Sequence, residues 1–201
     1  MDDIEALKKK GNEAYSKLRF EKACTLYGQC LEAMIHAENL KCNVCASEEF
    51  CKLKYVVFLN LAISNLKLGA SEGCRRCCNA ALVFCNNSTL ELKDLGIDDD
   101  LTRDVELREK LLPSVVPYAA KSLYRRGQSY VNDGQNELAL RDVSLAFRLV
   151  PSDAAIAQLL DDLTTKASSD ETKIDSSSHL NKIDDARYSQ CLFGCLEMHS
   201  L

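Results

Sequence analysis

The stretch KSLYRRGQSYVNDGQNELALRDVSLAFRLVP, residues 121–151, decides the fold. It predicts two helices, with Gly127 inside the first, a turn at Gly134 and an end at Pro151. The second helix carries small, large and small side chains at helical spacing: Ala139, Val143 and Ala146. We therefore expect these residues to form a pair of antiparallel helices.

The same pattern occurs twice more, earlier in the chain. One copy opens at Ile4 and has Gly11 at the glycine position, followed at matching intervals by Phe20, Ala23, Tyr27 and Cys30. The other opens near Tyr55; Ala62 replaces the glycine, Gly69 makes the turn, and the small, large and small positions hold Cys74, Cys78 and Ala81. A cysteine at a close helix contact behaves as a slightly larger alanine, so we expect packing roles for Cys30, Cys74 and Cys78.

Repeated helix pairs of roughly 34 residues are typical of tetratricopeptide repeats (TPR). The sequence therefore predicts an all-α fold in which three TPR pairs stack as a right-handed superhelix. The expected repeats lie near residues 4–38, 53–87 and 117–151.

The chain after Pro151 predicts one further helix over residues 152–166, capped by Ser152. Its apolar residues fall on one face, which should cover the last repeat: Ile156, Leu159, Leu160 and Leu163. Residues 1–166 then make the TPR domain, and the polar residues 167–201 a flexible tail. The apolar segment CLFGCLEM, residues 191–198, is either a docking segment or the end of a truncated product.

Two insertions separate the repeats. The first surrounds residues 38–52 and is expected to lengthen the helices beside it. The second spans about residues 89–119, where the acidic run Asp98 to Asp100 is expected to cap a short helix from Leu101 to Leu112.

Composition excludes several classes of function. The net charge of −5 disfavours a nucleic-acid reader, and no apolar run is long enough to cross a membrane. Eleven cysteines without a secretory signal indicate reduced thiols and a cytoplasmic protein. The three histidines form no arrangement with a nucleophile, and no phosphate-binding glycine loop occurs. We therefore expect neither an enzyme nor a bound cofactor.

A zinc site is the alternative for one group of residues in the first insertion, spaced H-x5-C-x2-C-x5-C: His36, Cys42, Cys45 and Cys51. Four nitrogen and sulfur ligands suit tetrahedral zinc. A second CxxC pair, which would make the pattern specific, is missing, so we predict free thiols and no metal.

A candidate binding site follows from residues on the first helix of each pair. Lys8 and Asn12 are four residues apart, as are Lys121 and Arg125, and Asn60 lies on the helix between them. Together they offer three cations and two amides as donors. A peptide that ends in Asp presents two carboxylates on one residue, and charge-assisted bonds to such a group are strong. The sequence therefore predicts capture of an acidic C-terminus in a concave groove.

The segments KKKGNEAY, FLNLAISNLKLG and KSLYRRGQSY resemble the carboxylate-clamp TPR family of chaperone cofactors, which includes the Hsp-organising protein and the large immunophilins. The resemblance covers about residues 2–166. It implies that the clamp is formed by Lys8, Asn12, Asn60, Lys121 and Arg125. It also implies binding of the Glu-Glu-Val-Asp terminus of a seventy- or ninety-kilodalton heat-shock chaperone.

The alternative is a general TPR scaffold that binds another acidic peptide or assembles a complex. In either case we expect a monomer. Tyr15 and Asn65 are secondary candidates for the groove, since both lie near the same helix faces as the clamp. Tyr15 would either contact an apolar residue of the peptide or pack in the core, as aromatic residues at helical spacing usually do.

Overall fold

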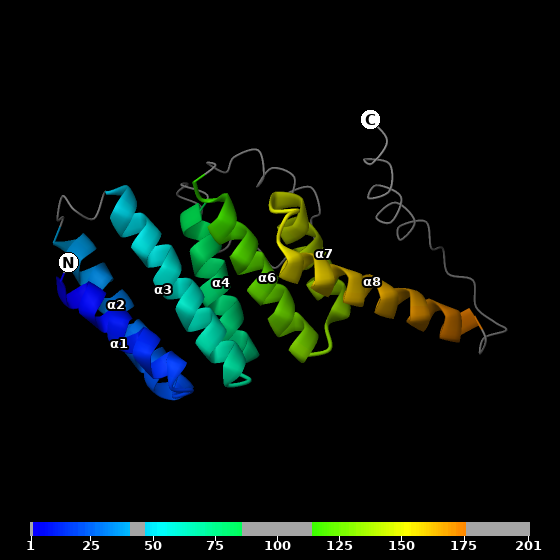
Figure 1. The fold of residues 1–201 in the computed structure, drawn as a ribbon, viewed down its shortest axis with the longest axis horizontal. Helices are drawn as coiled ribbons and strands as arrows, with labels where there is room; N and C mark the ends of the chain where they lie inside the picture. The colour runs from blue at the N-terminus through cyan, green and yellow to red at the C-terminus, as the bar shows by residue number, and fades with distance from the viewer. Residues whose placement is uncertain (1, 41–46, 86–113, 176–201) are drawn as a thin grey trace. The chain divides into compact units, whose positions relative to one another are not determined.

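The computed structural model describes residues 2–40, 47–85 and 114–175. Every regular element within these ranges is a helix (Figure 1), and there are seven: α1 (Asp2–Ser16), α2 (Phe20–Asn39), α3 (Glu48–Lys67), α4 (Ser71–Cys85), α6 (Val116–Asn132), α7 (Asn136–Leu149) and α8 (Ala154–Asp175). The all-α prediction is confirmed. The expected helix from Leu101 to Leu112, its acidic cap and the segment 191–198 lie outside the described residues.

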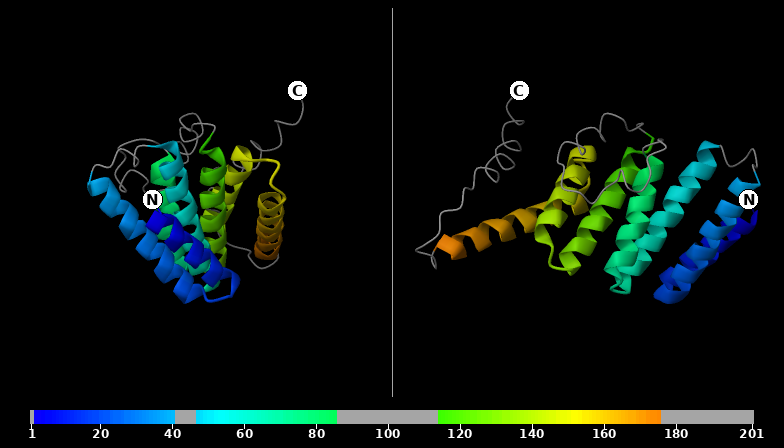
Figure 2. Two further views of the ribbon diagram at one scale, coloured as in Figure 1. Left: turned by 60° about the vertical axis from the view of Figure 1, so that its left-hand side comes forward. Right: turned by 180° about the vertical axis from the view of Figure 1, so that it is seen from behind.

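The helices up to α7 pack as three successive hairpins, α1 with α2, α3 with α4, and α6 with α7. The views in Figures 1 and 2 show the hairpins following one another in chain order. Helix α3 contacts both α1 and α6, so the first helices of the three pairs lie side by side. This row carries every residue predicted for the clamp.

Close contacts hold each hairpin together. Gly11 of α1 lies against the Tyr27 ring of α2, and Gly127 of α6 lies against Val143 of α7. The small residues expected at these contacts have no exposed surface: Ala23, Cys30, Ala62, Cys74, Ala81, Ala139 and Ala146. Burial of these faces is the main stabilising contribution, because isolated helices of this length are marginal in water.

The three hairpin turns share one geometry. Gly69 and Gly134 have φ values of +72° and +73°, in the left-handed region that glycine adopts without strain. The first turn places Leu18 in the same region, with φ of +57°. Leucine is strained in this region. Because the turn holds a leucine where the other two hold a glycine, no glycine in the sequence indicates it.

The first insertion lengthens the helices on either side of it, as predicted. Helices α2 and α3 each have 20 residues. Ser47 caps α3 by accepting a 3.2 Å hydrogen bond from the backbone N–H of Phe50. Buried Lys54 of α3 donates to both carboxylate oxygens of Glu38 at 2.8 Å, which ties the extended end of α2 to α3.

The chain divides into two compact units, Met1–Thr165 and Lys166–Leu201. In the first unit, Ile156 and Leu163 of α8 are buried with the core of the third hairpin. The predicted cap Ser152 is wrong: Asp153 Oδ1 accepts from the N–H groups of Ala155 and Ile156, at 3.0 and 3.3 Å. Ser152 lies one residue too early, in the preceding turn.

Helix α8 ends at Asp175 and so continues past the predicted end at residue 166. No helix among the described ranges combines the length and the apolarity needed to cross a bilayer.

Candidate functional site

Polar contacts of two predicted clamp residues and of a third link α1, α3 and α6. Asn60 Nδ2 of α3 donates to Asn12 Oδ1 of α1 at 3.1 Å. The guanidinium of Arg125, on α6, donates to the backbone carbonyl of Leu59 on α3. We call Asn12, Asn60 and Arg125 the amide–arginine cluster. It joins residues that are far apart in the sequence through contacts on one central helix.

The two predicted lysines stand one helical turn before members of the cluster. Lys8 precedes Asn12 on α1, and Lys121 precedes Arg125 on α6, each by four residues. Lys8 is half-buried and lies close enough to Cys30 to lower the pKa of that thiol, against the larger raising effect of burial. Lys121 is exposed. Neither ammonium forms an ion pair with a carboxylate of the described residues.

Arg125 is a partly buried cation without an acidic partner in the described residues. Burial lowers the pKa of its guanidinium, because the charged form loses solvation. The titratable groups that oppose this effect are thiols and phenols rather than carboxylates: Cys78, Cys74, Tyr15 and Tyr124. Within the described residues, its positive charge is therefore incompletely compensated.

The next residue, Arg126, has the opposite environment. It is buried, and its Nε and Nη2 donate to the two carboxylate oxygens of Asp142 at 2.6 and 2.8 Å. Its Nη1 donates to Asn79 Oδ1 at 2.8 Å. Burial alone would lower the pKa of Arg126, but the Asp142 charge outweighs it and the pKa is raised. The charge and the donors of Arg126 are thus satisfied by Asp142 and Asn79, whereas Arg125 has no carboxylate partner among the described residues.

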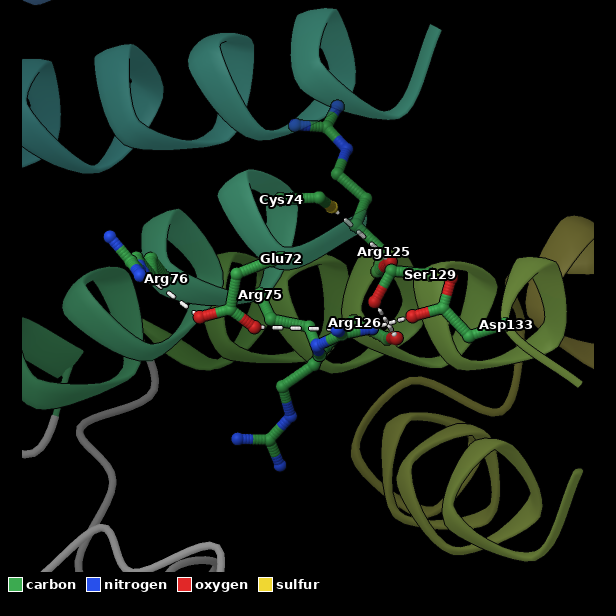
Figure 3. A network of polar contacts seen from close by, with 8 residues as sticks. All are labelled: Glu72, Cys74, Arg75, Arg76, Arg125, Arg126, Ser129 and Asp133. Carbon is green, nitrogen blue, oxygen red and sulfur yellow. Dashed lines mark hydrogen bonds and ion pairs between the residues drawn. The ribbon is translucent and has the colours of Figure 1, made fainter. Parts of the chain in front are cut away.

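Two further arginines, Arg75 and Arg76, form ion pairs with carboxylates. Arg75 bonds with Asp133 and Glu72, and its guanidinium lies 5.3 Å from the centre of the Tyr130 ring. Glu72 also pairs with Arg76 at 2.9 Å. Figure 3 shows that the Arg125 side chain extends away from the Glu72, Arg75 and Asp133 network. The guanidinium of Arg125, which lacks a carboxylate partner among the described residues, therefore lies apart from the ion pairs within α4 and from the pair that joins α4 to Asp133 at the end of α6.

Tyr27 is a member of the site that the sequence did not reveal. It is 2% exposed, and its hydroxyl donates to Asn12 Oδ1 at 2.7 Å. Burial raises its pKa to about 12, although a hydrogen bond with the Asn60 side chain acts in the opposite direction. The hydroxyl therefore adjoins both amides of the cluster. The available signal was Gly11, whose missing side chain makes room for the ring.

The two secondary candidates differ in position. Tyr15 packs edge-to-face on Phe20, with ring centres 5.3 Å apart, and interacts electrostatically with Arg125. Its phenol therefore lies within electrostatic range of Arg125.

Asn65 instead faces α4. Its Nδ2 donates to the carbonyl of Leu61 at 2.9 Å, and a Cβ on Gly73 of α4 would lie 2.7 Å from its Oδ1. Five residues after Asn60, the helix has turned this side chain away from the cluster. We therefore leave Asn65 out of the proposed site.

The buried cysteines have packing roles and local bonds. Cys30 Sγ donates to the carbonyl of Ile4 at 3.3 Å, and Cys74 Sγ to that of Arg125 at 3.6 Å. A hydrogen bond from Cys78 lowers the pKa of Cys74, while burial raises that of Cys78. Among the described residues no group of three or more potential ligands could hold a metal, and Cys42 and Cys45 lie outside them.

Comparison with known proteins gives one curated relative and several similar folds. No family model matches the chain. Peptidyl-prolyl cis-trans isomerase D of Eremothecium gossypii is 30% identical over 160 residues, which cover 78% of this chain and 35% of that protein. The chain therefore spans only about a third of the relative's length.

Solved structures of TPR domains superimpose on most of the chain. The first TPR domain of human RPAP3 has a TM-score of 0.54 at 17% identity, covering 85% of this chain and 96% of its own. The fold is that of a TPR domain. The C-terminal TPR-containing domain of a Plasmodium falciparum FK506-binding protein has a TM-score of 0.57 at 18% identity, covering 85% and 92%. The first TPR of Spaghetti (RPAP3), solved with the HSP90 peptide SRMEEVD, has a TM-score of 0.54 at 16% identity, covering 83% and 97%.

Proposed function

We propose that this TPR domain is a peptide-binding adaptor of the carboxylate-clamp type, a cochaperone that captures the C-terminal Glu-Glu-Val-Asp of a heat-shock chaperone. The observation that carries the proposal is Arg125, a partly buried guanidinium that donates to the carbonyl of Leu59, the residue before Asn60, and has no carboxylate partner among the described residues. A ligand carboxylate would supply the missing negative charge.

The donors around Arg125 suit a residue that carries two carboxylates. Arg125 can donate two parallel hydrogen bonds to one carboxylate, while Lys8 and Lys121 act as mobile point charges. Asn12 and Asn60 add neutral donors between the cations. A C-terminal Asp presents both its main-chain and side-chain carboxylates to this set. For so small a contact we expect a dissociation constant on the order of micromolar.

The similarity to the Spaghetti domain supports the ligand class, because that domain was solved with a peptide ending in Glu-Val-Asp. The proposal concerns binding and involves no chemical step. It extends to this chain the ligand of a domain with the same fold, and the five clamp positions provide the chemical reason.

A peptide titration tests the proposal directly. The full 201-residue chain is titrated with Met-Glu-Glu-Val-Asp and, separately, with the same peptide amidated at its C-terminus. We expect saturable binding of the free acid and at least tenfold weaker binding of the amide, because amidation removes one of the two charges. Equal binding of both peptides, or binding of neither, would contradict the clamp.

Neighbouring lysines provide a matched pair of variants. Lys8→Ala and Arg125→Ala should each weaken binding about tenfold or more, as expected for loss of a charge-assisted bond. Lys9→Ala removes the same charge from the same helix, one residue away and therefore about 100° around it. Its affinity should stay close to wild type. Equal losses in Lys8→Ala and Lys9→Ala would indicate non-specific attraction, and a thermal melt of each variant separates binding from folding.

A further inference from the structure

The side-chain amide of Asn12 forms hydrogen bonds to the described residues through its oxygen and not through its nitrogen. Its Oδ1 accepts from the Tyr27 hydroxyl at 2.7 Å and from Asn60 Nδ2 at 3.1 Å. An amide oxygen has two lone pairs, so both are in use. The Nδ2 group makes no hydrogen bond to a described residue. Asn12 is therefore held with its acceptor turned toward the protein and its two N–H donors available to a ligand.

Tyr27 is the one member of this set that is anchored in the core. Its ring lies against the backbone of Gly11, where an added Cβ would be 2.6 Å from Cε1 and 2.8 Å from Cδ1. Real Cβ atoms essentially never approach so closely, so only glycine permits this ring position. Gly11 directly precedes Asn12, and the close approach places the hydroxyl beside the next side chain along α1.

The other two repeats show that packing alone does not require a hydroxyl here. The large position of the helix contact holds Tyr27 in the first repeat, Cys78 in the second and Val143 in the third. All three side chains are buried. Only the tyrosine reaches past the contact to a polar side chain on the neighbouring first helix. It does so in the repeat that carries Asn12.

We propose that Tyr27 is a positioning residue for the anion site: its hydroxyl fixes the Asn12 amide so that the N–H donors face the bound carboxylate, with Gly11 making room for its ring. The inference rests on the proposed function for the identity of the ligand. The orientation of the Asn12 amide in the free protein can be tested without that ligand. Tyr27 itself does not touch the ligand. It acts through Asn12, so its effect should vanish where Asn12 is absent.

Tyr27→Phe in the full chain tests the inference, since it keeps the ring against Gly11 and removes only the hydroxyl. Affinity for Met-Glu-Glu-Val-Asp should fall about three- to tenfold, the range expected for one hydrogen bond. Tyr130→Phe is the matched control: Tyr130 is also buried, and a phenyl ring keeps its contact with Arg75. In an Asn12→Ala background, Tyr27→Phe should cause no further loss. Unchanged affinity in Tyr27→Phe, or a full additional loss in the Asn12→Ala background, overturns the proposal.

A second measurement needs no peptide. The side-chain NH₂ signals of Asn12 in ¹⁵N-labelled free protein should shift in Tyr27→Phe and stay in place in Tyr130→Phe. If wild type fails to bind the peptide, the proposed function fails, and these signals still decide whether Tyr27 orients Asn12. Signals of Asn12 that do not move in Tyr27→Phe contradict the positioning role.

Discussion

Arg126 and Asp142 form a two-point ion pair between α6 and α7, with N–O distances of 2.6 and 2.8 Å. Both residues are buried, and the third guanidinium nitrogen is satisfied by Asn79 of α4. Removal of Asp142 would leave the buried charge of Arg126 without its counter-charge. We therefore predict that Asp142→Ala lowers the free energy of unfolding by about 3–5 kcal/mol, as measured by urea denaturation.

The exposed ion pairs of α4 give the control for this prediction. Glu72 bonds to Arg75 and Arg76, and its side chain is 62% exposed. Solvent and mobile ions screen such pairs, so Glu72→Ala should cost less than about 1 kcal/mol. An equal loss of unfolding free energy in Asp142→Ala and Glu72→Ala would show that burial does not make the Arg126–Asp142 pair more important for stability than an exposed pair.

Substitution by alanine should have opposite effects on stability at Gly127 and at Gly28. A Cβ on Gly127 would lie 2.6 Å from Val143 Cγ2, whereas a Cβ on Gly28 would have no neighbour within 4 Å. Gly127→Ala should therefore destabilise by about 1–3 kcal/mol through overpacking. Gly28→Ala should stabilise by about 0.5–1 kcal/mol, because alanine favours a helix interior. Urea unfolding of both variants checks the prediction, and a shared sign would contradict it.

Leu18 offers a stabilising substitution in the first turn. The turn has the same backbone hydrogen bond as the two glycine turns, from Arg19 N–H to Ala14 O at 2.9 Å. Leu18 is 74% exposed, so glycine would forfeit little burial while relieving the left-handed strain. We predict that Leu18→Gly raises stability by about 0.5–1 kcal/mol after the entropic cost of glycine.

Leu68→Gly is the control for that substitution, because Leu68 is also an exposed leucine at a hairpin turn but has φ of −85°. Without strain to relieve, it should lose about 0.5–1 kcal/mol. Thermal melts of the two variants should therefore shift in opposite directions. A lower melting temperature for Leu18→Gly would disprove the strain at this turn.

The helix pairs were predictable because each depends on residues close together in the sequence. Ala139, Val143 and Ala146 lie on one face of a single helix, and all three are fully buried as that pattern indicates. Turn chemistry was predictable where glycine marks it. It failed at Leu18, which adopts a left-handed conformation that leucine disfavours.

The site was predictable only as a set of positions. Helical spacing places Lys8 with Asn12 and Lys121 with Arg125, but spacing does not determine how side chains orient between helices. The bond from Tyr27 to Asn12 depends on the depth of the contact at Gly11, which no periodicity reports. Asn65 likewise turned toward α4 because five residues do not make a whole number of helical turns.

Alkaline pH should destabilise the domain through Tyr27. Its pKa is about 12 in the folded chain against an ordinary value of 10.0, so folding favours the protonated phenol. The associated stability is fully present below about pH 10 and is lost as pH rises toward 12, because the unfolded chain ionises first. The loss is on the order of 2–3 kcal/mol for this group. Tyr15, Cys24 and Cys30 lie close enough to Tyr27 to add to its shift.

Tyr27→Phe separates the contribution of Tyr27 from that of the other groups. Burial also raises the pKa of Cys77 to about 12, so both proteins should lose stability in this range. Subtracting the unfolding free energies of the two proteins at each pH cancels the contribution of that thiol. The difference should be constant below about pH 10 and move in favour of Tyr27→Phe by about 2 kcal/mol up to pH 12. A difference that stays constant across the whole range would mean that the phenol is not desolvated in the fold.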